Sequence, residues 1–246
     1  MSLIDLCLVA SRRPDLLLST LEGFSVHVFR NINIGDVFVN LDPIFGGRDE
    51  HAQCIEIIRS YFPEANIFEP GVPGFCAAVR RVWGATSGRF VFHLEDDWLP
   101  LYDVNDEVLG LFSDQEVAQV SFHTLDRKWD IERKGPFHYT RIYHRIMGIK
   151  IPTFRYFPRF TTAPSILSGD FARACALRML EKYDPEKQFY SGVNPELQLY
   201  VSKYKNYIYT FDGGPVIRDL GRAWASEHGI VKRALGSESI WTGGGT

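Results

Sequence analysis

Apolar and polar positions follow one another in blocks along residues 1–100, which predicts strands and helices in turn. Continuous apolar runs at Leu3–Ala10 and Arg89–Leu94 are typical of strands buried on both faces of a parallel sheet. Between them the pattern predicts strands at Val26–Phe29, Asp36–Leu41 and Asn66–Phe68, and helices at Asp15–Gly23, His51–Phe62 and Phe75–Thr86. Strands and helices alternating at these lengths indicate βαβ units and an α/β fold with a mainly parallel sheet flanked by helices.

The spacing changes after residue 100. The elements predicted there are a helix at Asp106–Phe112, a strand at Val117–Phe122, helices at Ser168–Tyr183 and Asn194–Tyr204, and a strand at Asn206–Phe211. No repeat or low-complexity linker separates the two parts. We therefore expect one domain over residues 1–241, with halves 1–100 and 101–241, and a flexible tail at 242–246.

Three consecutive carboxylates, Glu95, Asp96 and Asp97, follow the apolar run that ends at Leu94. In open α/β sheets, ligands bind beyond the carboxyl ends of the strands. Adjacent acids repel one another, and burying them is costly unless a cation is near. A hard divalent cation such as Mg²⁺ or Mn²⁺, sharing its shell with a phosphate, would meet this need. The alternative is an exposed acidic turn after a strand.

Composition narrows the possible partners. The net charge of −3 and a pI near 6.2 provide no general attraction for nucleic acid. The four cysteines show no metal-ligand spacing, and neither a secretion signal nor an apolar run of membrane-spanning length occurs. We therefore expect a protein of a reducing, cytoplasmic setting without a transmembrane segment.

Several enzyme classes lack their usual motifs in this chain. There is no Gly-x₄-Gly-Lys-Ser/Thr phosphate loop and no Gly-x-Gly-x-x-Gly, and neither His-Glu-x-x-His nor Gly-x-Ser-x-Gly occurs. The sequence thus offers no support for a P-loop NTPase, a nicotinamide dehydrogenase, a zinc protease or a serine hydrolase.

An ordered set of features along residues 1–100 resembles a known family. The first strand ends in Ser11-Arg-Arg-Pro14, the second ends in the acid Asp42, and a glycine loop and helix, Gly74–Arg81, precede the strand that carries Glu95-Asp96-Asp97. In this order they resemble the nucleotide-diphospho-sugar glycosyltransferases of the GT-A fold, family 2-like. The acidic cluster is similar to the family's Asp-x-Asp motif in a Glu-Asp-Asp form.

The resemblance implies roles for individual residues of the first half. Donor-binding roles fall to Ala10, Ser11 and Arg13 around the nucleoside, Asp42 at the base, Arg80 or Arg81 at the diphosphate or sugar, Asp96 at the ribose or sugar, and Glu95 behind them. Asp97 would be the metal ligand, for Mn²⁺ or Mg²⁺. The donor would be a UDP or GDP sugar.

In the second half the resemblance implies a catalytic base and a further metal ligand. The base is expected at the start of a helix, where Glu196 follows Asn194-Pro195, with Asp170 as the reserve candidate. Acids are also favoured in a first helical turn by the helix dipole alone. Asp219 and His228 are candidates to complete the metal or diphosphate site, although a lone histidine is commonly structural.

Residues 133–169 contain no Asp or Glu but seven Lys and Arg, with many aromatic residues. They could hold an acceptor through Tyr139, Tyr143, Arg155 and Tyr156, touch an anionic membrane, or form a solvated β-hairpin. We favour the first. The expected function is a metal-dependent, inverting glycosyltransferase acting on a glycan or other hydroxyl acceptor. The alternatives are a sugar nucleotidyltransferase and a non-catalytic carbohydrate-binding module.

Overall fold

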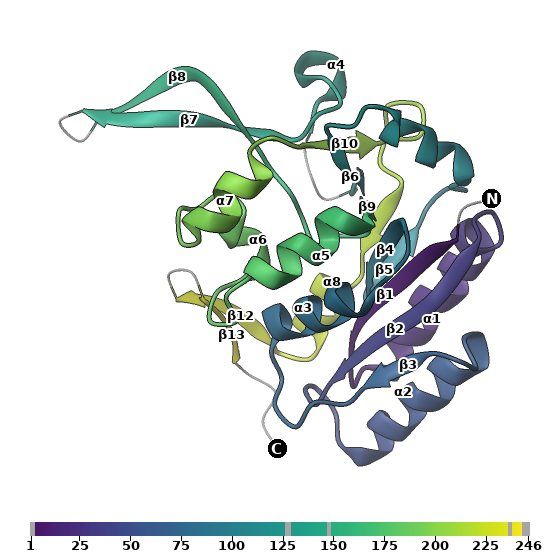
Figure 1. Ribbon diagram of the computed structural model, residues 1–246. Coiled ribbons are helices and arrows are strands. Elements are labelled where there is room, and N and C mark those ends of the chain that lie inside the picture. Colours follow the sequence, from purple (N-terminus) through teal and green to yellow (C-terminus); the bar gives the residue numbers. More distant parts are fainter. Residues whose placement is uncertain (1–2, 126–128, 147–148, 236–237, 243–246) are drawn as a thin grey trace.

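A seven-stranded sheet forms the centre of the computed structural model, which describes residues 3–125, 129–146, 149–235 and 238–242 (Figure 1). In spatial order its strands are β10 (Lys205–Tyr209), β6 (Val117–Phe122), β9 (Ser165–Ser168), β4 (Phe90–Glu95), β1 (Ile4–Ser11), β2 (Ile34–Asp42) and β3 (Asn66–Phe68). All pairs are parallel except the two that β9 makes with β4 and β6. The predicted mixed, mainly parallel α/β sheet is confirmed.

The register of the three central strands brings polar side chains to one edge of the sheet. Every residue of β1 is buried, as its apolar sequence predicts. At its carboxyl end Ser11 pairs with Asp42 of β2, and Val9 pairs with Glu95 of β4. The polar residues that end or follow β1, β2 and β4 therefore lie beside one another.

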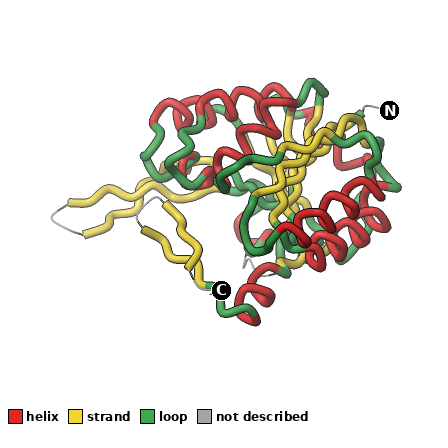
Figure 2. Tube along the Cα trace, turned by 90° about the horizontal axis from the view of Figure 1, so that it is seen from below, coloured by secondary structure: helices red, strands yellow, loops and turns green. Residues whose placement is uncertain are grey.

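Helices cover both faces of the sheet (Figure 2). They are α1 (Pro14–Phe24) and α2 (Arg48–Tyr61) on one face, and α3 (Phe75–Ala85) and α5 (Gly169–Arg178) on the other. Successive strand residues point to opposite faces, so Leu8 packs with the first helix pair and Val9 with the second. The two cores hold the sheet edge in place between them.

The remaining elements lie mainly beyond the carboxyl edge or on the periphery. They are a π-helical turn (Ser25–Phe29), β5 (Trp98–Pro100), a 3₁₀ helix (Asp106–Ser113), α4 (Ile131–Lys134), β7 (Tyr139–Ile146), β8 (Ile149–Pro158), α6 (Pro185–Gln188), α7 (Pro195–Val201), β11 (Ile217–Asp219), α8 (Gly221–Glu227), β12 (Val231–Leu235) and β13 (Glu238–Thr242). β11 pairs with β5 antiparallel, which returns the chain to the turn after β4. No described helix is long and apolar enough to cross a membrane.

Two predicted elements are corrected. Val26–Phe29 is part of a π-helical turn and not a strand. Val28 is buried four residues after the buried Phe24, while Val26 is exposed, so the apolar spacing is helical. The helix predicted at Ser168–Tyr183 ends at Arg178, because Met179 has extended backbone angles.

The predicted domain boundaries stay predictions. Of the proposed tail, residues 243–246 lie outside the described part of the chain.

Candidate functional site

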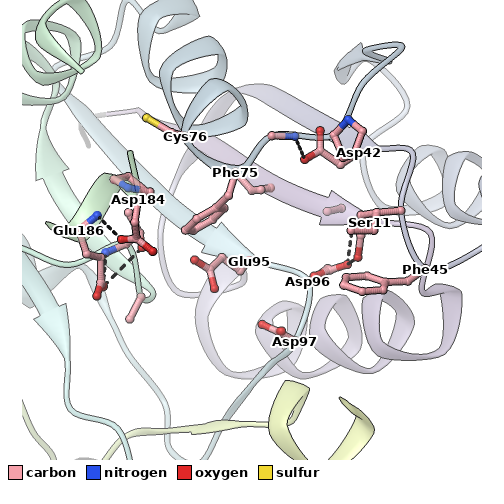
Figure 3. A pocket seen from close by; sticks show the side chains of 18 of the residues that line it. Ser11, Asp42, Phe45, Phe75, Cys76, Glu95, Asp96, Asp97, Asp184 and Glu186 are labelled. Carbon is pink, nitrogen blue, oxygen red and sulfur yellow. Dashed lines mark hydrogen bonds between the residues drawn. The ribbon is translucent and has the colours of Figure 1, made fainter. Parts of the chain in front are cut away.

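A pocket of about 980 Å³ opens at the carboxyl ends of β1, β2 and β4 (Figure 3). Of the predicted donor-site residues, those that line it are Ala10, Ser11, Arg13, Asp42, Glu95, Asp96 and Asp97. The sheet register explains why they meet, since they end or follow three adjacent parallel strands. This is the edge at which open α/β sheets bind ligands.

Asp96 is the most enclosed acid of the cluster, with a 2% exposed side chain. Its Oδ2 accepts hydrogen bonds from the backbone N–H of Ser11 at 2.8 Å and from the Ser11 hydroxyl at 3.0 Å. Its Oδ1 accepts from Nη2 of Arg13. Because both oxygens are already engaged by β1 and its following turn, Asp96 ties the acidic turn to the first strand.

Arg13 is the cation that partly balances these acids. Besides Asp96, its Nη2 contacts Oδ2 of Asp97 at 3.1 Å. The guanidinium carbon lies 5.4 Å from the ring centre of Phe45 and 5.2 Å from that of Trp224. Desolvation opposes the charged guanidinium, but the two carboxylates outweigh it and raise the pKa of Arg13. The residue therefore stays positive and links the first turn to α8.

Asp97 lies under the segment that joins β11 to α8. Its backbone carbonyl accepts from the N–H of Leu220 at 2.8 Å, and its side chain is 17% exposed. Burial, with the charges of Asp96 and Asp219, raises the pKa of Asp97 to about 6, against the lowering effect of Arg13. The cluster thus holds more negative charge than Arg13 neutralises, which favours the approach of a further cation.

Asp42 is held from two sides at the far end of the pocket. Its Oδ2 accepts from the N–H of Gly74 at 3.0 Å, and its Oδ1 accepts from the Asn40 amide at 2.8 Å. Arg81 in turn donates to Oδ1 of Asn40. A line of hydrogen bonds therefore runs from α3 through β2 to the pocket wall.

The two arginines predicted at the diphosphate do not line the pocket. Arg81 is directed at Asn40, and Arg80 pairs with Glu181 at 2.6 Å and donates to the carbonyl of Ala176. Arg80 therefore connects α3 to α5 and the segment after it, and Arg81 connects α3 to β2. Glu95 does line the pocket, and its Oε2 accepts from the Trp98 indole at 3.3 Å.

Neither candidate base from the sequence lies in the pocket lining. Glu196 is 78% exposed and faces Arg178 at 3.5 Å. Asp170 is 94% exposed and pairs with Arg173 on its own helix at 2.7 Å. Each acid occupies a first helical turn, which the helix dipole favours without any ligand.

The two C-terminal candidates separate. Asp219 lines the pocket beside Asp97 and pairs with Arg222 at 3.0 Å. His228 does not line it; its ring stacks on Trp224 at 4.2 Å, and its Nδ1 donates to the Trp224 carbonyl at 2.8 Å. His228 therefore packs against its own helix α8.

Sequence reasoning missed several pocket residues, among them Phe45, Thr162, Asp184 and Glu186. Phe45 has a positive φ of 72°. A phenylalanine in a sequence gives no indication that its backbone adopts this uncommon conformation. Asp184-Pro185 does carry a readable signal, since an acid before proline is a common helix start.

Within the basic and aromatic stretch 133–169, β7 and β8 pair as an antiparallel hairpin that extends away from the sheet (Figure 1). The rings of Tyr139 and Tyr156 meet edge to face at 4.7 Å. The side chains of Tyr143 and Arg155 lie outside the described part of the structure. Among the described residues, none of those that line the pocket belongs to the hairpin.

The donor atoms fit a hard divalent cation that arrives with a phosphate ligand. Within the described ranges, no three His, Cys, Asp or Glu residues are grouped so that they could hold a metal ion by themselves. Asp97 and Asp219 offer carboxylate oxygens at one place, and Mg²⁺ is often bound by one or two carboxylates plus substrate phosphates. These two residues could therefore hold such an ion together with a diphosphate.

Several solved structures share this fold. The chain is similar to a mannosyltransferase from Pyrobaculum calidifontis in complex with GDP-Man and Mn²⁺ (TM-score 0.57, 12% identity, 89% of this chain and 57% of that one). It is also similar to S. aureus TarS (0.55, 10%, 88% and 36%) and to GalNAc-T7 with UDP, GalNAc and Mn²⁺ (0.50, 11%, 87% and 45%). No family model and no curated protein matches the sequence.

The chain thus spans between about a third and three-fifths of the length of these structures. At such low identity the likeness concerns the backbone, and the mixed sheet with its flanking helices agrees with it. The described chain has the GT-A fold.

Proposed function

We propose that this protein is a glycosyltransferase that moves a sugar from a nucleotide diphosphate donor to a hydroxyl of a glycan or other acceptor. The observation that carries the proposal is the meeting of Asp42, Asp96 and Asp97 in one large pocket at the carboxyl edge of a GT-A sheet. A UDP or GDP sugar, with Mn²⁺ or Mg²⁺, is the proposed donor. The reaction would be a single displacement and would invert the anomeric carbon.

The donor half of the pocket divides the work among its residues. Asp42, fixed by Asn40 and Gly74, lies where the base would be recognised. Asp97 and Asp219 would hold the cation, which supplies charge stabilisation to the departing diphosphate. Arg13 and Asp96 keep the acidic turn in position next to β1.

A thermal-shift panel of UDP- and GDP-sugars with and without Mn²⁺ tests the donor. A ligand that binds only the native state raises the free energy of unfolding by RT ln(1 + [L]/Kd), so the true donor should raise the melting temperature. Asp97→Ala should abolish the Mn²⁺-dependent part of the shift and lower donor turnover about a hundredfold or more, because metal catalysis contributes several kcal/mol.

Asp103→Asn is the matched control, since Asp103 is an exposed acid paired with His27 and Arg30 away from the pocket. It should keep the donor-induced shift and the turnover of the wild type. Equal turnover in wild type and Asp97→Ala would refute the metal role. Glycan binding that does not depend on a nucleotide would instead indicate a binding module. Release of pyrophosphate from a nucleoside triphosphate and a sugar phosphate would indicate a nucleotidyltransferase.

A further inference from the structure

Glu186 occupies the pocket wall that faces the acidic turn. It lies in α6, whose first turn is capped by Asp184, and both carboxylates line the pocket on the side away from Asp96 and Asp97 (Figure 3). The Oδ1 atom of Asp184 accepts from the backbone N–H groups of Glu186 and Lys187 at 3.0 and 3.2 Å. Asp184 thus fixes the helix that carries Glu186.

The side chain of Glu186 is oriented through one of its two oxygens. Oε1 accepts from the Thr161 hydroxyl, from the N–H of Thr162 at 2.9 Å and, more weakly, from the Thr162 hydroxyl at 3.4 Å. These contacts do not use Oε2. A carboxylate anchored by one oxygen can present the other to a ligand in a fixed direction.

A buried glutamine supports this anchor from behind. Gln119 of β6 accepts from the N–H of Thr161 at 3.1 Å and donates to its carbonyl at 2.7 Å. The same amide group donates to the Ser165 hydroxyl at 2.9 Å, so the sheet fixes the orientation of Gln119. Gln119 and Thr161 are 0% and 1% exposed. Such a two-sided clamp on a loop residue is the kind of support that holds a catalytic group within its working geometry.

Glu181 on the same wall and Glu196 nearby in the sequence have other partners. Glu181 pairs with Arg80 at 2.6 Å and is 59% exposed. Glu196, at the place where the family resemblance points for a base, lies outside the pocket lining beside Arg178. Glu186 therefore combines a place in the lining with an anchored carboxylate.

We propose that Glu186 is the general base for the acceptor, an inference that rests on the proposed glycosyltransferase function. Oε2 of Glu186 accepts the proton of the acceptor hydroxyl, while the oxygen of that hydroxyl forms the bond to the anomeric carbon of the donor sugar. The bond from that carbon to the phosphate oxygen breaks, and its electron pair leaves with the nucleotide diphosphate. The proton on Glu186 then passes to water. Thr161 and Gln119 are positioning residues.

The decisive comparison is Glu186→Gln against Glu196→Gln, the same acid-to-amide change at the residue outside the pocket. Turnover would be followed as release of UDP or GDP from UDP-glucose, UDP-GlcNAc and GDP-mannose, with water and with a panel of nitrophenyl glycosides as acceptors. Glu186→Gln should lower kcat by about 10²–10⁴-fold, the usual contribution of a general base. Its melting temperature and donor-induced shift should stay near those of the wild type, because the amide oxygen can still accept from Thr162.

Glu196→Gln should keep the kcat of the wild type. A Glu186→Gln variant with unchanged kcat in a protein that transfers sugar would overturn the base assignment and leave the proposed function standing. A wild type that neither binds nor consumes any of these donors would overturn both.

Azide separates a base from a residue that only holds α6 in place. It is an anionic nucleophile that needs no proton removed, so sodium azide should restore nucleotide release in Glu186→Ala with formation of a glycosyl azide. It should not do so in Asp97→Ala, where departure of the diphosphate is impaired. A correctly folded Glu186→Ala, with circular dichroism like that of the wild type, that gains nothing from azide would contradict the proposal.

The positioning role is tested by Thr161→Val, which removes the hydroxyl donor to Oε1, and by Thr161→Ser, which keeps it. Val should lower kcat with little effect on KM for the donor, and Ser should recover most of the loss. Equal kcat in both variants would show that the anchor does not orient Glu186.

Discussion

At the scale of single residues, the acidic turn carries more negative charge than the nearby Arg13 can neutralise. Arg13 contacts both Asp96 and Asp97, yet Asp97 also faces the charge of Asp219 beneath a covering segment. Ionising a buried carboxylate near other acids is unfavourable until a cation arrives. We therefore expect the acidic turn to destabilise the ligand-free protein and to strengthen its binding of a cation.

This imbalance predicts an unusual pH dependence for Asp97→Asn without metal. The pKa of Asp97 is raised to about 6 in the folded protein, whereas an unfolded aspartate titrates near 3.9. Between these values the folded chain keeps a proton that the unfolded chain has lost, so Asp97 makes the stability of the wild type fall as the pH rises. Asn cannot contribute this loss.

Asp97→Asn should therefore gain stability relative to the wild type as the pH rises from about 4 to 6, by about 1.4 kcal/mol at most for each unit by which the pKa of Asp97 is raised. Urea unfolding at several pH values would measure it. Asp103→Asn provides the opposite sign, because the hydrogen bond with His27 lowers the pKa of Asp103 and ionisation there is stabilising. A constant difference between wild type and Asp97→Asn over this range would show that the carboxyl titrates normally.

At the scale of elements, β11 and α8 close the site that β1 and β4 begin. β11 aligns Asp219 opposite Trp98 of β5, and the chain then passes directly over Asp97. At Gly221 an added Cβ would lie 2.2 Å from Oδ2 of Asp97. A side chain at the start of α8 would therefore have to displace the side chain of Asp97.

Gly221→Ala should force α8 and Asp97 apart. Overpacking of this kind typically costs about 1–3 kcal/mol of stability. We also expect weaker Mn²⁺-dependent binding of the donor, since Asp97 must rotate or its cover must move. Gly110→Ala is the matched control, because a Cβ there meets nothing within 4 Å. Melting temperatures and Mn²⁺ titrations of the two variants would decide it; an unaffected Gly221→Ala would mean that the turn yields without cost.

The elements also show what the sequence could predict. The strands β1, β2 and β4 and their polar ends followed from local apolar runs, and Asp42, Asp96 and Asp97 meet as expected. β9 and β11 were missed because both are short and pair with strands far away in the sequence. Glu186 was missed for a related reason: its position depends on Thr161 and Gln119, which no spacing in the sequence connects to it.

At the scale of the whole molecule, structure is unevenly supported. β1 lies between two parallel partners and under helices on both faces, whereas β7 and β8 pair only with each other among the described strands. An isolated two-stranded ribbon is marginally stable in water. Local opening should therefore be far easier in the hairpin than in the sheet.

Hydrogen exchange followed by mass spectrometry would map this difference. Backbone amides of β1 should exchange most slowly, and those of the hairpin 139–158 within the earliest time points. Protection of the hairpin comparable to that of β1 would contradict the expectation and would indicate that a partner covers it in solution.

The placement of β9 has a consequence for how the chain is made. β4 ends at Glu95, and the strand that pairs with its free edge is β9, which begins only at Ser165. β9 also joins β4 to β6 and β10. At about 5–20 residues per second, a ribosome needs on the order of ten seconds to synthesise the intervening segment. During that interval the backbone N–H and C=O groups along the uncovered edge of β4 are open to pairing with another strand. Newly made chains should therefore be most prone to aggregation, and most dependent on chaperones, before β9 has left the ribosome.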